Sequence, residues 1–563
     1  MTLFLWESNR GVYVGQLHSS TMKRSDRPIL TTHAGRLDGP PELTKLSRDV
    51  MAGRVAGEQG TVGSAVTTRA LSCLAIAACV FTAAACSSQV ANQAEKTTGV
   101  TVFEGARLIT GDGSAPIEDS AFIVQDSRFF GVGRRGEVQV PAGAARVDLT
   151  GKTVMPAKVD VHGHLGYENV VAGTTSKENY TRENLIDHLE RYAYLGFSAV
   201  ISIADLVERE IMPGDHLNVF QAPRDPKMPK TGRFPWGDVP FRMQEEVVPN
   251  AALFRTAGPG MSWPGAGAGG HPSRNDVMYP VTTEDEARRA VQDYVKNKVA
   301  FVKIWVDTRE GKLKTLTPPL YRAIIDEASK HDVSVTAHTV TLADAKELYK
   351  AGLVGATHIP VRGGEVPDEE LLAIIRDRVA KSDRPIWFNE PGNLAALGPQ
   401  AWDDPLLWEM LPREQVMAQQ GDDFKRMTPE VVERARQSTR ETGQAAKALI
   451  GAGMKLVYGS DNGSAGRGFG WYEQLKFENW VTMGFTPAEA IVMATRDSAA
   501  VGQFNTGMVA AGKSADFIVL DANPLENIAN TRRINRVYLR GQEVDRAGLR
   551  ARWQARWKPT TTR

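Results

Sequence analysis

Short apolar runs alternate with longer amphipathic stretches through the middle of the chain, and this alternation limits the fold more than any other feature. Residues 197–204, 300–306 and 333–338 are apolar runs, and each follows a segment with helical periodicity. Apolar runs without an alternating polar face are typical of parallel strands covered on both sides by helices. The pattern predicts an α/β fold, and a count of runs close to eight favours a (β/α)8 TIM-like barrel over residues 156–506.

Both flanks of this region have a different texture. Residues 99–155 and 507–545 contain short strand-like runs that are separated by turn residues such as Gly111-Asp112-Gly113. Because these segments bracket the α/β region, they predict one small β-sandwich domain formed by both chain ends, and residues 546–563 remain as a C-terminal tail. An open parallel sheet is the alternative to the barrel, but no G-x-G-x-x-G motif opens a helix here.

The N-terminal part of the chain carries the pattern of an export signal. An uncharged, apolar run at 70–85 follows Arg69 and ends at Cys86, in a small-residue context that resembles a bacterial lipobox. The run is short for a membrane span, which needs about 20 residues. We therefore expect residues 51–86 to be a signal peptide that starts at Met51, with Cys86 as the lipidated N-terminus of the mature protein.

This interpretation predicts an exported bacterial protein that is periplasmic or anchored to a membrane as a lipoprotein. Residues 1–50 are then an over-extended gene start or a disordered extension, and residues 87–98 are a polar tether. The alternative is a disordered tail in front of a buried, alanine-rich helix.

The charges and the cysteines exclude several classes of function. With 67 basic and 66 acidic side chains the net charge is +1, which gives no reason to expect nucleic acid as a partner. The three cysteines all lie at or before Cys86. The region that follows therefore has no disulfide framework, thiolate metal site or cysteine nucleophile.

A pair of histidines, His162 and His164, ends the first apolar run of the α/β region. Residues i and i+2 of a strand face the same way, so both imidazoles can reach one metal ion. Taken alone, such a pair is as often structural as it is metal-binding. The position of the pair, where the β-rich segment ends and the α/β region begins, favours a metal site.

Lys303 lies within an apolar run, Ala300 to Val306, where an ammonium group is costly to bury. A lysine that faces solvent on an edge strand, or that pairs with Asp307, would explain its presence. The functional alternative is a neutral lysine whose pKa is lowered by burial and by nearby cations. Such a lysine can add carbon dioxide and form a carbamate that bridges two metal ions.

Three further apolar runs end in a residue that can bind metal. His338 and His358 close consecutive runs, so they are expected at the same edge of a parallel sheet. A single histidine at such a position is more often structural than a ligand. Asp461 closes the last run, where it can bind metal and take a proton from water. Its structural alternative is a turn before Asn462-Gly463.

Together these residues resemble the amidohydrolase superfamily, in its binuclear branch that contains imidazolonepropionase and Xaa-Pro dipeptidases. The likeness covers roughly residues 100–545. It implies two divalent metal ions, expected to be zinc, and a metal-bridging hydroxide that attacks the substrate. It further implies that His162 and His164 bind the more buried ion and that a carboxylated Lys303 bridges both ions. His338 and His358 bind the second ion, and Asp461 is both ligand and general acid/base.

The resemblance implies hydrolysis of carbon–nitrogen bonds in a small amide or dipeptide. A lactonase or esterase would use the same metal site, and an isomerase or decarboxylase would use the same scaffold. A non-catalytic, exported binding protein is the alternative from another class. A homo-oligomer is compatible with the sequence, which does not specify one.

Residues near the expected mouth are candidates for binding the substrate. His271, in a glycine-rich loop, can donate to the substrate carbonyl, and Arg362 can pair with a substrate carboxylate. Trp305 can line an apolar subsite, although core packing explains it equally well. The long segment 391–427 is a candidate lid or binding loop.

Overall fold

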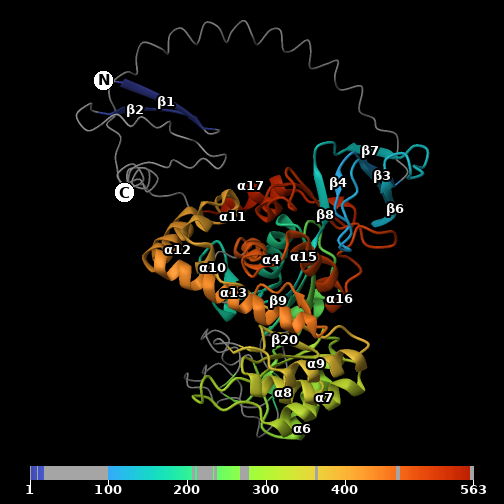
Figure 1. The fold of residues 1–563 in the computed structure, drawn as a ribbon, viewed down its shortest axis with the longest axis vertical. Coiled ribbons are helices and arrows are strands. Elements are labelled where there is room, and N and C mark those ends of the chain that lie inside the picture. The colour runs from blue at the N-terminus through green and yellow to red at the C-terminus, as the bar shows by residue number, and fades with distance from the viewer. Residues whose placement is uncertain are drawn as a thin grey trace, which may run out of the picture. The chain divides into compact units, whose positions relative to one another are not determined.

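The computed structural model divides the chain into two compact units, residues 1–95 and residues 96–563 (Figure 1). In the first unit, β1 (Thr2–Ser8) pairs antiparallel with β2 (Gly11–Leu17). The predicted signal peptide, Cys86 and the tether lie outside the described residues. Besides β1 and β2, the structure describes residues 99–205, 210–211, 232–233, 238–264, 266, 278–361, 365–463 and 470–557.

The α/β part of the second unit is built on two parallel sheets. One has the strand order β15-β12-β9, and the other has the order β17-β16-β18-β19-β20-β21-β22. Every neighbouring pair is parallel, which confirms the predicted α/β class. The strands are β9 (Lys158–Gly163), β12 (Phe197–Ser202), β15 (Leu253–Thr256), β16 (Met261–Ser262), β17 (Tyr279–Pro280), β18 (Val302–Trp305), β19 (Val335–His338), β20 (Gly355–Thr357), β21 (Trp387–Asn389) and β22 (Lys455–Val457).

Backbone hydrogen bonds connect the two parallel sheets at two places. Beside β9, Val161 N donates to Tyr458 O at 2.9 Å, just past the end of β22. Beside β15, Ala300 N donates to Thr256 O at 2.8 Å, just before β18. These two hydrogen bonds hold β9 beside the end of β22 and β15 beside the start of β18, although the paired strands are separated in the sequence.

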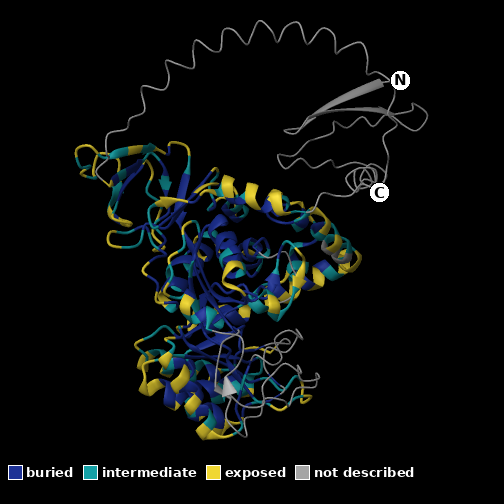
Figure 2. Ribbon diagram, turned by 180° about the vertical axis from the view of Figure 1, so that it is seen from behind, coloured by how far each residue is buried: buried dark blue, intermediate teal, exposed yellow. Residues whose placement is uncertain are grey.

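Helices cover these sheets, and their starts follow local sequence signals. Thr486 caps α15 in a reciprocal box with Glu489, because each side chain bonds the backbone nitrogen of the other. Figure 2 shows buried residues on the strands and exposed residues on the outer sides of the helices. The main helices are α4 (Arg182–Tyr194), α6 (Glu284–Lys296), α7 (Pro318–Lys330), α8 (Leu342–Ala351), α9 (Glu369–Lys381), α13 (Pro429–Gly451), α14 (Lys476–Thr482), α15 (Pro487–Val492) and α16 (Ser498–Val501).

The β-rich part combines strands from both flanks of the α/β region. Its five-stranded sheet has the order β25-β24-β23-β8-β4, and its four-stranded sheet has the order β6-β5-β3-β7. In the first sheet β23, from the C-terminal flank, pairs antiparallel with β8, from the N-terminal flank. The strands are β3 (Val100–Glu104), β4 (Arg107–Leu108), β5 (Ser120–Gln125), β6 (Arg128–Arg134), β7 (Ala145–Asp148), β8 (Thr153–Pro156), β23 (Phe517–Leu520), β24 (Ile534–Leu539) and β25 (Gln542–Glu543).

One aromatic cluster joins these two sheets. The ring of Phe517 stacks on Tyr538 with the centroids 4.6 Å apart, and it meets Phe103 edge-on at 5.0 Å and Phe122 edge-on at 5.1 Å. Phe103 and Phe122 belong to the four-stranded sheet, whereas Phe517 and Tyr538 belong to the five-stranded sheet. Burial of these rings holds the two chain ends together.

Phe517→Ala is expected to lower the free energy of unfolding by about 3–5 kcal/mol, because it removes a fully buried ring from this cluster. Phe130 on β6 is the matched control, since its side chain is 63% exposed and its replacement by alanine should change stability by at most about 0.5 kcal/mol. Urea unfolding followed by fluorescence measures both. Equal losses in the two variants would contradict the packing described here.

Two segments have more structure than the sequence predicts. The segment 391–427, expected as a lid or binding loop, consists largely of helices: α10 (Leu394–Leu397), α11 (Pro405–Met410) and α12 (Arg413–Arg426). The stretch from 546, expected as a tail, contains α17 (Arg546–Arg556), whose Trp553 is buried against α4.

Specific contacts fix α17 on α4. The guanidinium carbon of Arg191 lies 4.4 Å from the centroid of the Trp553 ring, and Trp553 Nε1 donates to Asp187 at 3.1 Å. Within the described residues, no helix has the length and apolar character that a membrane crossing requires.

Candidate metal centre

Five of the six predicted metal-binding residues lie at or near the C-terminal ends of the parallel strands, and the sixth, Lys303, lies within a strand. His162 is in the last part of β9 and His164 follows it, while Lys303 lies in β18. His338 ends β19, His358 follows β20, and Asp461 lies a few residues beyond β22. The C-terminal ends of parallel strands share one edge of a sheet, and this is where active sites of α/β barrels form.

Asp461 lies at the centre of the group. Its Oδ1 is 3.0 Å from His164 Nε2 and 3.4 Å from His162 Nε2, and its Oδ2 is 3.9 Å from His358 Nε2. One ligand atom from each of His162, His358 and Asp461 lies within 4.8 Å of the other two. Ligand atoms about 2 Å from a shared ion have separations of this order.

The two histidines of the pair direct lone pairs at this carboxylate. His164 Nδ1 lies 2.6 Å from the carbonyl oxygen of Ile203, which can only accept, so the proton is on Nδ1. The Nε2 atom of a neutral His164 therefore faces Asp461 Oδ1 with a lone pair. Two acceptors at 3.0 Å repel each other unless a cation or a proton lies between them.

The protonation states of the group suit a cation. Burial lowers the pKa of His162 well below its ordinary value, so its imidazole is neutral at pH 7. Burial opposes ionisation of Asp461, but His162, His164 and His358 outweigh it and hold the pKa of that carboxyl well below its usual range. Neutral imidazole and ionised carboxylate are the forms that bind metal.

Lys303 is buried, with 1% of its surface exposed, so the solvent-facing alternative is excluded. Its Nζ contacts Thr357 Oγ1 and lies 5.1 Å from the centroid of the Trp305 ring. Asp307, the other alternative partner, instead accepts from His338 and from Arg309, at 3.1 and 3.2 Å. Burial lowers the pKa of the Lys303 amine to about 7, so a large fraction is neutral at physiological pH.

Two carboxylates, Asp307 and Asp160, contact the proposed ligands or their backbone, and the sequence did not identify either as part of the site. Asp307 accepts from His338 Nε2, a contact that lowers the pKa of this carboxyl to about 2. Asp160 Oδ1 accepts from the backbone nitrogens of His162 and Ser460, at 2.9 and 3.1 Å. Asp160 therefore ties β9 to the residues that lead to Asp461. Its position two residues before His162, on the same strand, was the signal available.

Asn389, the last residue of β21, is a third residue that the sequence did not identify. Its Oδ1 lies 3.3 Å from His162 Nδ1 and 3.3 Å from the backbone nitrogen of His358. The apolar run before Asn389 ends in a polar residue in the same way as the runs before His338 and His358. That likeness was the signal, although asparagine is a less obvious ligand type.

A buried carboxyl behind the site makes stability depend on pH. Burial raises the pKa of Glu473 from 4.5 to about 8, although Asn462 Nδ2 donates to its Oε1 at 2.9 Å. Between these values the folded state keeps a proton that the unfolded state releases. The stabilisation from this group is complete below pH 4.5, and it is lost as the pH rises towards 8.

Glu473→Gln is expected to flatten this dependence, because glutamine is neutral at every pH and keeps an oxygen for Asn462. The free energy of unfolding, measured in urea at pH 5 and pH 8, should change less in the variant than in the parent. The contribution of Glu473 to the slope of the parent is at most about 1.4 kcal/mol per pH unit. Glu526→Gln is the control, since that side chain is 73% exposed. If the free energy of unfolding depends on pH equally in the parent and in the Glu473 variant, Glu473 is ionised in the folded state.

Of the three predicted substrate-binding residues, the structure describes only Trp305. His271 and Arg362 lie outside the described residues. Trp305 is 4% exposed, and its ring packs so closely on Gly260 that a Cβ there would lie 2.2 Å from it. Trp305 therefore lines the interior beside Lys303, and its contact with substrate stays a prediction.

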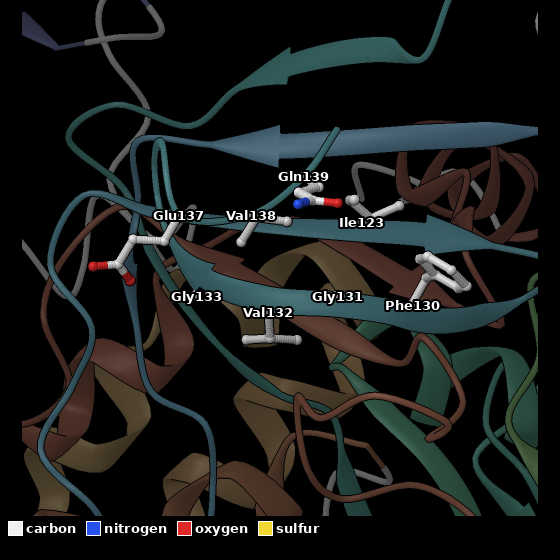
Figure 3. Close-up of a pocket in the computed structure, with 8 residues that line it drawn as sticks. All are labelled: Ile123, Phe130, Gly131, Val132, Gly133, Glu137, Val138 and Gln139. Atoms are coloured by element: carbon white, nitrogen blue, oxygen red, sulfur yellow. The ribbon is translucent and has the colours of Figure 1, made fainter. Parts of the chain in front are cut away.

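A separate pocket of about 290 Å³ lies on the four-stranded sheet of the β-rich part (Figure 3). It is lined by Ile123 on β5, by Phe130 to Gly133 on β6, and by Glu137 to Gln139 in the segment that follows. Glu137 is its one ionisable residue, so the pocket lacks the histidines and the lysine of the metal centre.

Comparisons with known proteins identify the family to which this chain is similar. The model of the amidohydrolase family matches residues 251–544, more than half of the chain, a range that includes Lys303, His338, His358 and Asp461. No curated protein sequence matches the chain significantly.

Several solved structures share the fold at low sequence identity. Molinate hydrolase is 19% identical, with 82% of this chain and 98% of that chain covered and a TM-score of 0.57. Phenylurea hydrolase B is 20% identical, with 82% and 99% covered and a TM-score of 0.56. A Xaa-Pro dipeptidase with bound methionine is 17% identical, with 79% and 99% covered and a TM-score of 0.55. With the family match, we conclude that this protein belongs to the amidohydrolase family and is a hydrolase that acts on carbon–nitrogen bonds.

Proposed function

We propose that this protein hydrolyses a carbon–nitrogen bond in a small amide or dipeptide at a centre of two divalent metal ions, which we expect to be zinc. The convergence of His162, His358 and Asp461 within 4.8 Å carries the proposal. The donor set fits a cation, because the Nε2 atoms of His162 and His164 converge on the ionised carboxylate of Asp461 at 3.4 and 3.0 Å.

The ligands divide between the two ions according to their strands. His162 and His164, from β9, would hold one ion, and His338 and His358, from β19 and the end of β20, would hold the other. Lys303, as a carbamate, and Asp461 would complete the centre. The buried amine of Lys303 supports carbamate formation, since a pKa near 7 leaves it neutral enough to add carbon dioxide.

Bound metal ions would supply Lewis-acid polarisation of the scissile carbonyl and would lower the pKa of the attacking water. Asp461 would accept the proton of that water and later give it to the leaving amine. Asp307 would keep His338 in one ring orientation, and Asp160 would keep the segments of His162 and Asp461 in register.

A closed (β/α)8 barrel and a β-sandwich complete the proposal for the fold. The backbone hydrogen bonds from β9 to Tyr458, just past β22, and from Ala300, just before β18, to β15 support barrel closure. The aromatic cluster shared by the four-stranded and five-stranded sheets supports the sandwich.

The substrate class rests on the chemistry of the centre and on the structural neighbours. Molinate hydrolase, phenylurea hydrolase and Xaa-Pro dipeptidase are named for small substrates. A lactone or ester is a candidate for an additional substrate, because the same metal centre would polarise its carbonyl. Turnover of amide, dipeptide, lactone and ester panels by the same preparation distinguishes these candidates.

We further propose that the protein is exported and that Cys86 carries a lipid. The apolar run at 70–85 and the small residues before Cys86 support this location. Radiolabelled palmitate incorporated into the parent, and absent from Cys86→Ser, would establish the modification. Equal labelling of both would exclude Cys86 as its site.

The metal content of the chain from Ser87 onward tests the main proposal. After expression with zinc and bicarbonate, elemental mass spectrometry is expected to find about two metal ions per chain. Dialysis against a chelator should remove the metal together with amide turnover, and zinc should restore both. A content of one ion or none would contradict the binuclear centre.

A further inference from the structure

Asn389 contacts two of the proposed ligands at once. It is fully buried, and its side-chain oxygen lies 3.3 Å from His162 Nδ1 and 3.3 Å from the backbone nitrogen of His358. His162 belongs to β9 and His358 follows β20, whereas Asn389 ends β21. One amide therefore lies between residues that would bind different ions.

The orientation of this amide follows from its contacts. The backbone nitrogen of His358 can only donate, so the atom of Asn389 that faces it is the oxygen. The same oxygen faces His162 Nδ1, which therefore carries the imidazole proton. The lone pair of His162 is then on Nε2, the atom that faces Asp461 Oδ1 at 3.4 Å. Asn389 thus fixes the tautomer in which His162 can bind metal at the centre.

The contact also steadies an unusual backbone conformation. His358 has a φ of 93°, in a region that residues with a side chain rarely adopt. Such a conformation persists only where its surroundings hold it. The hydrogen bond from the nitrogen of His358 to Asn389 Oδ1 is one such restraint.

Gly459 provides the room for this arrangement. A Cβ at position 459 would lie 2.6 Å from Asn389 Cγ and 2.7 Å from His162 Cβ, closer than such atoms approach. Only the amide oxygen of Asn389 is engaged, because its Nδ2 finds no hydrogen-bond partner among the described residues. An acceptor is therefore what position 389 supplies.

We propose that Asn389 is a positioning residue that couples the two ion sites, by setting the tautomer of His162 and holding the backbone of His358. This inference rests on the proposed binuclear function. It predicts that loss of the acceptor at position 389 weakens both ions together, although Asn389 binds neither.

Zinc titration of the full chain, with a chromophoric chelator as competitor, tests the coupling. In Asn389→Leu, which matches the size but removes the acceptor, both dissociation constants are expected to rise about 10- to 100-fold. Asn389→Asp keeps an acceptor and should bind zinc within a few-fold of the parent. Gly459→Ala leaves the amide intact but crowds it, and should resemble Asn389→Leu.

Phe388→Leu is the control for a merely structural effect. Phe388 is buried on the same strand but faces the opposite side of the sheet, so its replacement should lower stability without changing zinc affinity. Nitrogen NMR of labelled histidine should also show His162 protonated on Nδ1 in the parent and in Asn389→Asp, and a loss of this preference in Asn389→Leu.

The outcomes separate this inference from the proposed function. If the parent binds two zinc ions and Asn389→Leu binds them with unchanged affinity, the coupling role is overturned and the binuclear centre stands. If only one of the two constants changes, Asn389 positions a single ligand and the coupling is likewise overturned. If the parent itself binds fewer than two ions, the proposed function fails first, and this inference fails with it.

Discussion

Lys303→Ala is expected to abolish nearly all amide hydrolysis and to reduce the metal content from about two ions per chain to one or fewer. Lys303 is the buried amine of the group, and without it no carbamate can bridge the ions. The loss of metal affinity should exceed the roughly 10- to 100-fold that removal of an outer-shell partner costs. Elemental mass spectrometry and turnover of the best amide substrate measure the two effects on one preparation.

A short carboxylate provides a stringent check of this prediction. Acetate or propionate can enter the space that alanine leaves and can offer the two oxygens that a carbamate would offer, so millimolar additions should restore part of the activity and the metal. Lys312→Ala is the matched control. Because Lys312 is 73% exposed, its replacement should leave both the amide turnover and the metal content unchanged. Near-normal turnover of Lys303→Ala without added carboxylate would rule out the carbamate.

Asp461→Asn is expected to lower kcat by about 10²- to 10⁴-fold, the range for removal of a general acid or base. Asparagine keeps the shape and one oxygen, so much of the metal should remain bound. The loss should appear in kcat rather than in KM, because proton transfer occurs in the transition state. Steady-state kinetics with metal analysis of the same samples provides the measurement.

Asp332→Asn is the control for this variant, since its side chain is 85% exposed. If Asp461→Asn retains parental kcat with two bound ions, another group moves the proton. If it loses both ions and activity together, Asp461 acts as a ligand alone.

The α/β class was predictable because it depends on local periodicity. Each apolar run between helical segments indicates a strand, whatever the rest of the chain does. The strand ends were predictable for the same reason, so His338, His358 and Asp461 could be placed at one edge. The β-rich flanks could also be recognised from their short runs and turn residues.

The contacts that Asp307 and Asn389 make in the site were not predictable, because they depend on distances between strands. Asp307 could have paired with Lys303 or with His338, and only the packing assigns it to His338. Asn389 carries no ligand signature, yet its oxygen meets two histidines from other strands. The segment 391–427 lacked a clear periodic pattern, but burial of Trp402 against Trp471 stabilises it as helices.

The sequence by itself determined the residue types at the strand ends, and with them the chemistry that the centre can perform. Only the tertiary structure decided which atoms of those residues face one another. His358 adopts a left-handed backbone, Lys303 is fully buried, and Asp461 lies between three imidazoles. The physical reason is that ligand identity is a property of one position, whereas tautomer, burial and pKa depend on neighbours that folding brings from distant parts of the chain.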